Sequence, residues 1–191
     1  MSNLLDQVIK SFNTIRCMLE YRGAPLELLA NVSDVELRAM VYESQVFDIP
    51  VNNNMKIIYM LYPKFKIAEI RELIDETTQK VVIITKEALT PTHHKQYNED
   101  YSALDSQFFT LKELQVNIAK HVLVPHHEIV HDHDTVTKIM TQFHVKSKNQ
   151  FPILLKTDAM AKYINAKTGD LVRIVHVSPS AGDYVSYRCC V

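Results

Sequence analysis

Two uninterrupted apolar runs, at residues 57–62 and 81–85, constrain the fold of this chain more than any other feature. Runs of this length without polar alternation are typical of strands that are buried on both faces of a helix-covered sheet. Residues 67–74, which lie between them, have the apolar spacing of a helix. A strand, a helix and a second strand at this spacing predict a βαβ unit with parallel strands. A further apolar stretch and helix, at about 107–124, would extend this α/β layer.

Two helices are predicted before these strands. The first has its apolar side chains three and four residues apart, so that they share one face: Leu4, Val8, Phe12, Ile15 and Leu19. Gly23 and Pro25 give this helix a stop signal. The second helix is expected to follow Ser33, because Ser33 and Glu36 have the spacing of a capping box.

The last third of the chain predicts a helix and a hairpin. Asp134 can cap a helix with an apolar face formed by Val136, Ile139, Met140 and Phe143. A short strand is expected after Phe151 and Pro152, followed by a helical turn capped by Asp158. Residues 171–177 and 184–191 then read as two strands, with a turn at 178–183 that contains proline and glycine.

The charge distribution changes along the chain, although the formal net charge is only −1. Residues 1–137 hold 13 Lys and Arg against 19 Asp and Glu, whereas residues 138–191 hold 8 against 3. This excess is either a solvated basic face or a docking surface for an acidic partner. A histidine-rich stretch near His126–Asp134 marks the change. We therefore predict two domains, residues 1–125 and residues 126–191.

Composition excludes several classes of protein. The small net charge argues against a protein that binds nucleic acid unaided through phosphates. Three cysteines do not make a disulfide framework, so a reducing compartment is expected. No apolar run approaches the length of a membrane span, and the N-terminus lacks the pattern of a signal peptide.

The sequence offers no catalytic constellation. The three glycines are isolated at 23, 169 and 182, which excludes a phosphate-binding glycine loop. No nucleophile elbow is present, and Cys17 lies in the first predicted helix, where a buried structural thiol is expected. We therefore expect no catalytic residue and no cofactor.

The histidines invite a metal hypothesis, because neutral imidazole is a good ligand for zinc or copper. Four of them lie within eight residues, at His126, His127, His131 and His133. Neither a zinc-protease helix nor paired cysteines accompany them. We interpret them as polar loop histidines and predict no metal site.

Five segments within the last seventy or so residues resemble, in the same order along the chain, the sequence motifs of one known family. His121–His127 is similar to H-E-L-V-P-K-H, Phe151–Pro152 to L-P-R-I after a helix at 134–145, Asp158–Tyr163 to D-P-V-A-R-Y, Lys167–Ile174 to K-R-G-x-V-V-K-I, and Ser180–Arg188 to E-T-S-G-R-Y-x-x-Y-R. This is the pattern of the fifth, shared subunit of eukaryotic-type DNA-directed RNA polymerases, whose C-terminal part corresponds to a small subunit of the archaeal RNA polymerase. Weaker matches lie upstream: Tyr21–Gly23 resembles the end of the family's opening helix, and Ala88–Lys95 resembles N-I-T-P-S-A-M-K.

The resemblance implies an α/β fold with two parts and a non-catalytic role. An N-terminal α/β jaw domain, with a small sheet flanked by helices, would lie beside downstream duplex DNA. A compact, mixed α/β C-terminal assembly domain, ending in a β-hairpin, would dock on the largest polymerase subunit within the polymerase core. Catalysis would belong to the large subunits. The chain would then be neither a membrane protein nor a homo-oligomer.

The resemblance also assigns residues. A DNA-proximal loop would contain Thr90, Pro91, Thr92 and Lys95, whose hydroxyls and charge could contact phosphate. The residues that carry the docking motif are His121, Pro125, His127, Pro152, Asp158, Tyr163, Gly169, Arg173, Gly182, Tyr184, Tyr187 and Arg188. Gly169 and Gly182 are expected in left-handed turns. Arg173 and Arg188 are either partners for carboxylates of the large subunit or exposed arginines of little consequence.

This chain departs from the family pattern at five places. Val122 replaces a glutamate, His126 a lysine, Ile153 an arginine, Ala159 a proline and Asp183 an arginine. Our hypothesis is a divergent copy, such as one from a large DNA virus of eukaryotes. A cellular copy would be nuclear, whereas a viral copy would be found in the virion and in the cytoplasmic virus factory of the host.

Two other functions stay open at this point. A metal-dependent nuclease would explain the histidines, and would require a stoichiometric metal. A freestanding nucleic-acid-binding module would explain the basic tail, in which Tyr184, Tyr187 and Arg188 could stack on bases. Such a module would have to bind DNA or RNA as an isolated chain, with an affinity that falls with salt.

Overall fold

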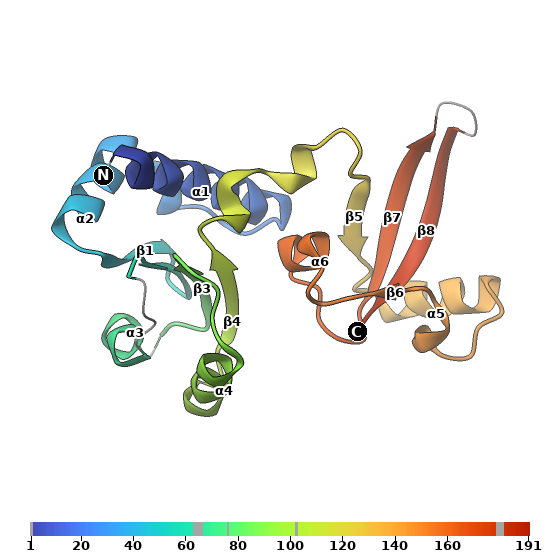
Figure 1. Ribbon diagram of the computed structural model, residues 1–191. Coiled ribbons are helices and arrows are strands. Elements are labelled where there is room, and N and C mark those ends of the chain that lie inside the picture. The colour runs from blue at the N-terminus through green and yellow to red at the C-terminus, as the bar shows by residue number, and fades with distance from the viewer. Residues whose placement is uncertain (1, 63–66, 76, 102, 179–181) are drawn as a thin grey trace. The chain divides into compact units, whose positions relative to one another are not determined.

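The computed structural model describes residues 2–62, 67–75, 77–101, 103–178 and 182–191. Its contacts divide the chain into two compact units, Met1–Val116 and Asn117–Val191 (Figure 1). This division precedes the predicted boundary between residues 125 and 126. The reason is local: the 3-10 turn η3 (Ile118–Lys120) packs against helix α6 (Ala159–Ile164) and therefore belongs to the second unit.

The first unit is an α/β layer. Its elements are α1 (Ser2–Tyr21), η1 (Leu29–Asn31), α2 (Asp34–Glu43), β1 (Val46–Asn52), β2 (Met55–Met60), α3 (Ile67–Leu73), β3 (Lys80–Thr85), α4 (Pro91–Asp100), β4 (Asp105–Thr110) and η2 (Glu113–Gln115). The strands form one sheet in the order β1-β2-β3-β4, in which β1 is antiparallel to β2 and the other pairs are parallel. The predicted α/β class and the β2–α3–β3 unit are confirmed.

Alternating side chains of β2 explain why both faces of this sheet are covered. Ile58 points to the face where Ile70 of α3 and Tyr97 of α4 are buried. Tyr59 points to the other face, where its hydroxyl lies 3.0 Å from the hydroxyl of Ser11 in α1. Figure 1 shows α1 on one side of the sheet and α3 and α4 on the other. An apolar run without alternation is the sequence consequence of this double burial.

In this unit one predicted helix start is confirmed, and one predicted helix is wrong. The capping box of Ser33 and Glu36 is present at the start of α2. The helix expected within 107–124 is wrong, because strand β4 is followed only by the 3-10 turns η2 and η3. Cys17 is half-buried rather than buried. None of the described helices is long and apolar enough to cross a membrane.

The second unit is a four-stranded sheet with helices against it. Its elements are η3, β5 (His126–Ile129), α5 (His133–Gln142), η4 (Lys148–Gln150), β6 (Ile153–Leu154), α6, β7 (Leu171–Ser178) and β8 (Gly182–Cys190). The strand order is β5-β7-β8-β6, in which β6 is parallel to β8 and the other pairs are antiparallel. The predicted hairpin is confirmed as β7–β8, although part of its predicted turn lies outside the described residues.

The core of this unit lies against the base of the hairpin. Leu171 of β7 and Cys189 of β8 are register partners, and both are buried with Phe151 beneath α5. Helix α5 contributes Val136 and Ile139 to this cluster. Four side chains of α6 are also buried: Met160, Ala161, Tyr163 and Ile164.

The start of α5 corrects one sequence prediction. The cap is Asp132, whose carboxylate accepts the backbone N–H of Thr135, and not Asp134, which lies in the first turn. Both aspartates precede the same apolar stripe, so the sequence pattern alone does not separate them. A carboxylate in the first turn is itself favourable, because the helix N-terminus carries partial positive charge.

Candidate functional site

Several of the predicted docking residues have their contacts inside the second unit. Asp158 caps α6, as predicted, because its Oδ1 accepts the N–H groups of Met160 and Ala161. Gly169 has φ of 91° and Gly182 has φ of 68°, which confirms the predicted left-handed turns. The carbonyl of Gly169 accepts a hydrogen bond from Lys148 Nζ at 3.0 Å.

His127 has a buried, structural environment. Its side chain is buried in β5, and its Nδ1 lies 2.7 Å from the carbonyl oxygen of Pro125. A carbonyl can only accept, so Nδ1 carries the proton in the neutral ring. Burial, which disfavours the charged ring, lowers the pKa of His127 below its usual value, although the Pro125 carbonyl opposes the shift. His127 therefore orders the end of the predicted motif rather than facing a partner.

This lowered pKa makes a testable contribution to stability. A group with a depressed folded pKa stabilises the fold above its unfolded pKa, about 6.5 for histidine, and the stabilisation is lost as pH falls through the folded value. We expect His127→Asn, whose amide can still donate to Pro125, to reduce the loss of stability between pH 7.5 and pH 5. Urea unfolding at both pH values measures it, with the exposed His131→Asn as control. An equal pH dependence in His127→Asn and the wild type would contradict this role.

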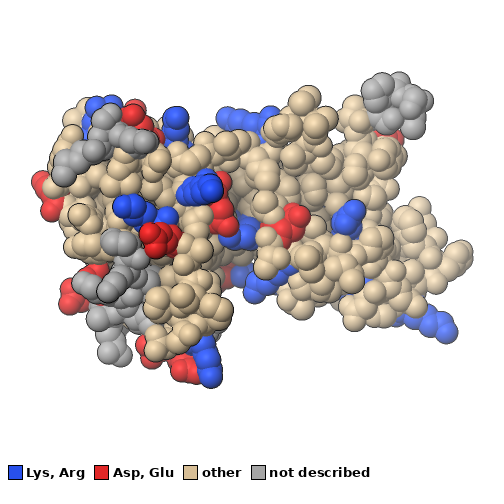
Figure 2. All heavy atoms as spheres, in the orientation of Figure 1, with Lys and Arg blue, Asp and Glu red and all other residues tan. Residues whose placement is uncertain are grey.

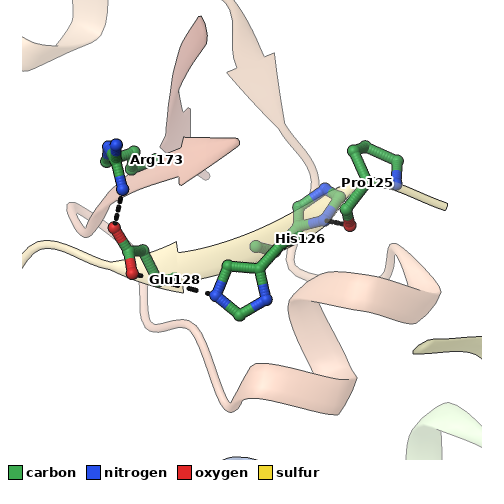
Figure 3. A network of polar contacts seen from close by, with 5 residues as sticks. Pro125, His126, Glu128 and Arg173 are labelled. Atoms are coloured by element: carbon green, nitrogen blue, oxygen red, sulfur yellow. Dashed lines mark hydrogen bonds and ion pairs between the residues drawn. The ribbon is translucent and has the colours of Figure 1, made fainter. Parts of the chain in front are cut away.

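A network of polar contacts crosses β5 and β7 (Figure 3). Arg173 and Glu128 are register partners, and Nη1 of the Arg173 guanidinium lies 2.5 Å from Oε1 of Glu128. The other Glu128 oxygen lies 3.8 Å from Nε2 of His126. All three side chains are partly or fully exposed. Glu128 of the same chain therefore competes with any carboxylate of a partner for Arg173, which was one of the two predicted roles of this arginine.

The aromatic residues of β8 do not form one stacking platform. Tyr187 lies against Phe143 and Phe151, with ring centroids at 5.6 and 6.3 Å. Tyr184 points to the opposite face of the strand and stacks on His176, at 4.5 Å and 6° between planes. Nη1 of Arg188 donates to the carbonyl oxygen of Ile153 at 3.1 Å. The three side chains are engaged separately within the fold.

Sequence reasoning missed the most exposed apolar side chains of this unit. Val122 and Leu123 are 92% and 82% exposed, and Val177 near the end of β7 is 81% exposed. Nδ1 of His121 accepts the N–H of Leu123, which fixes the turn that presents this pair. Two adjacent apolar residues in a short turn segment are a signal, but periodicity does not distinguish them from core residues.

In the first unit the predicted DNA-proximal loop is the start of a helix. Thr90 caps α4 by accepting the N–H of His93, and Pro91 occupies the first turn. Thr90, Pro91, Thr92 and Lys95 are all exposed. The Lys95 ammonium lies 4.0 Å from the Glu99 carboxylate one turn later. The pattern around Pro91 predicts a loop, but proline is also favoured at the first helical position.

The histidine cluster is dispersed over three kinds of structure. His126 and His127 lie in β5, His131 precedes the helix, and His133 is the first residue of α5. They are therefore not loop histidines alone, which corrects that part of the interpretation. Within the described parts of the chain, no three His, Cys, Asp or Glu side chains gather closely enough to hold a metal ion.

Comparison with known proteins identifies the family. Residues 116–190 match the family model described as RNA polymerase Rpb5, C-terminal domain. The DNA-directed RNA polymerase subunit Rpo5 of Methanocaldococcus jannaschii is 36% identical over 76 residues, which are 40% of this chain and 95% of the archaeal protein. The chain belongs to the Rpb5 family. The match to the Rpb5 model includes the hairpin β7–β8 and all of the predicted docking residues.

Longer relatives extend the similarity beyond the Rpb5 C-terminal domain. The DNA-directed RNA polymerases I, II, and III subunit rpabc1 of Dictyostelium discoideum is 29% identical over 200 residues, covering 93% of this chain and 98% of that protein. The corresponding RPABC1 of Caenorhabditis elegans is 26% identical over 121 residues, covering 63% of this chain and 56% of the nematode protein. The Dictyostelium alignment shows that the likeness includes the first unit.

Proposed function

We propose that this chain is a non-catalytic subunit of a multisubunit DNA-directed RNA polymerase. The observation that carries the proposal is membership of the Rpb5 family, together with relatives that are named as RNA polymerase subunits. The sequence itself offers no catalytic constellation and no cofactor motif. In this proposal, nucleotide addition and its metal ions belong to the large subunits.

The second unit would attach the chain to the largest subunit and so to the polymerase core. Support comes from exposed motif residues that the fold leaves at the surface: His121, Pro152, Tyr184 and Arg188. The exposed pair Val122 and Leu123 lies within the first motif segment and adds apolar surface, which is expected where a protein is docked. The buried or backbone-determining motif residues, such as His127, Tyr163 and Gly169, would act by shaping this unit.

The first unit would lie beside downstream duplex DNA, with the start of α4 as its nearest part. Thr90 and Thr92 carry exposed hydroxyls there, and Lys95 lies one turn further along α4. Figure 2 shows the charged side chains on one face of the molecule, where lysines and arginines are interspersed with acidic residues. The partial positive charge of a helix N-terminus suits a phosphate, while Pro91 has no N–H and the N–H of His93 is already accepted by Thr90. Such contacts position DNA without reading its sequence. The small net charge of the chain fits a contact that forms only within an assembly.

Lys95 gives this DNA contact a measurable signature. We expect Lys95→Glu, in the assembled polymerase, to weaken binding of downstream duplex DNA and to reduce the salt dependence of binding by about one phosphate contact. Lys80→Glu, at an exposed lysine that begins β3 and so lies at the opposite end of that strand from the start of α4, is the matched control. Equal DNA affinity for both variants at every salt concentration would rule the contact out.

The experiment that tests the proposed function is a tagged purification from native source material at elevated salt. Mass spectrometry should identify the two largest polymerase subunits in equal stoichiometry with the chain. Their sequences would also decide between a nuclear polymerase and a viral one active in a virus factory. Recovery of the chain alone would contradict the proposal. Micromolar binding of DNA or RNA by the isolated chain would instead support the freestanding nucleic-acid-binding module.

A further inference from the structure

The hairpin β7–β8 has an outer edge that the sheet leaves largely uncovered. In the order β5-β7-β8-β6, strand β8 has β7 on one side and β6 on the other. Strand β6 pairs only with Cys189 and Cys190. Of the strands that the structure describes, none therefore lies beside residues 183–188 on the β6 side.

The hydrogen bonds at the base of the hairpin show which backbone groups face this edge. The N–H groups of Cys189 and Val191 donate to Pro152 and Leu154, on the β6 side. The N–H of Cys190 donates to Asp170, on the β7 side. Backbone groups of successive residues in an antiparallel pair alternate between the two sides. Asp183, Val185 and Tyr187 therefore direct their N–H and C=O groups outward.

This edge lacks the features that protect edge strands from pairing. Protected edges are short, carry lysine or proline, or are twisted away by a bulge. The stretch Tyr184–Tyr187 contains no charge and no proline, and Tyr184, Val185 and Tyr187 are residue types that favour strands. The pairing of β8 with β7 runs without a bulge from Leu171↔Cys189 to Ser178↔Gly182. Val177 and Val185 are also exposed, at 81% and 37%, which leaves apolar surface beside the edge.

We propose that residues Asp183–Tyr187 of β8 bind an extended segment of the largest polymerase subunit as an added strand, in line with β6. The proposal rests on the proposed function and specifies how the second unit is held. Main-chain hydrogen bonds to the three outward residues would supply affinity, and side-chain contacts would supply specificity.

The charges of the edge specify the partner segment. Asp183 lies at the hairpin end of the edge and Arg188 at its base, with uncharged residues between them. The complementary segment is uncharged in its middle, rich in β-branched or aromatic residues, basic opposite Asp183 and acidic at the end that approaches Arg188. A nucleic acid does not fit this edge, because its backbone offers phosphate acceptors but no alternating amide donors. Asp183 is also a position where this chain departs from the family pattern, so the partner segment is expected to differ correspondingly.

The outward direction of Val185 allows a selective test. Val185→Pro removes an N–H that points away from β7, and proline is tolerated in edge strands, so the pairing with β7 remains. Val185→Thr keeps both the N–H and the branching at Cβ, and is the matched control. Amide hydrogen exchange on each free variant should show Tyr184 and Ser186 still protected by β7. That measurement shows that the hairpin is folded in both.

The decisive comparison is recovery of the largest subunit when each tagged full-length variant is co-expressed with the polymerase subunits of the same genome. We expect Val185→Pro to recover about tenfold less of the largest subunit than Val185→Thr does. The reason is that one main-chain hydrogen bond is lost and the partner's carbonyl group is left unpaired. Equal recovery would overturn the added strand, while the proposed function stands if both variants recover the polymerase. A wild-type chain that recovers no polymerase subunit would instead overturn the proposed function. A wild-type dimer that Val185→Pro converts to monomer, with unchanged polymerase recovery, would assign the edge to a second copy and overturn the proposal.

Discussion

Replacing Phe151 with alanine is expected to lower the free energy of unfolding of the second unit by about 3–5 kcal/mol. Phe151 is buried beneath α5 in one cluster with Leu171 and Cys189 at the base of the hairpin. Its ring also lies 5.8 Å from that of Phe143 at the end of α5. The substitution removes the largest of the buried side chains in this cluster, and leaves a cavity between α5 and the hairpin. Urea unfolding measures the loss.

Phe151→Leu is the matched control, because it keeps most of the buried volume and is expected to cost less than about 1.5 kcal/mol. Loss of the packing between α5 and the hairpin should also reduce recovery of polymerase subunits in the alanine variant. A cost below about 1 kcal/mol for Phe151→Ala would show that this cluster does not stabilise the unit.

Replacing Tyr97 with alanine is expected to be equally costly in the first unit, at about 3–5 kcal/mol. Of the α4 side chains that the structure describes, Tyr97 alone is buried. Its ring lies 4.9 Å from both Tyr101 and Phe108, and burial raises the pKa of its hydroxyl to about 12. Without this ring, α4 loses its buried contact with the sheet and keeps the edge contact of His94 with Phe108.

The expected effect is local as well as global. Amide hydrogen exchange should rise throughout α4 in Tyr97→Ala, and the contact with DNA proposed for Thr90 and Lys95 should weaken. Tyr97→Phe retains the ring packing and should preserve slow exchange in α4. Unchanged exchange in Tyr97→Ala would mean that other contacts position the start of α4.

Prediction from sequence succeeded where one physical rule determined the pattern. The buried parallel strands β2 and β3 were predicted because burial on both faces leaves no polar alternation. The caps at Ser33 and Asp158 were predicted because a side-chain oxygen beside a free N–H is a local requirement. Gly169 and Gly182 were predicted because only glycine enters left-handed turns at low cost.

Prediction failed where tertiary contacts outweighed a weak local signal. Strand β1 was missed because it carries Asp48 and Pro50, and proline argues against a central strand. Pro50 is tolerated here because β1 lies at the edge of the sheet and the register of β1 with β2 shifts between Pro50 and Asn52. Helix α4 was missed because most of its residues are polar, and Tyr97 is the one buried side chain among those of α4 that the structure describes.

In the candidate site, too, local features were predictable from the sequence and tertiary contacts were not. The motifs located the second unit and its hairpin, but they did not separate residues that shape the fold, such as His127, from exposed ones, such as Arg188. Burial and hydrogen bonds made that separation. The open edge of β8 was not predictable, because the side on which each backbone group lies depends on the pairing of β8 with both neighbours.

The most direct test of the central claim is whether the chain carries polymerase activity with it through purification. The tagged wild-type chain, purified from its native source at elevated salt, should elute with DNA-dependent RNA synthesis, and the isolated recombinant chain should have none. Elution of the chain in full yield without associated RNA synthesis and without the large subunits would contradict the account.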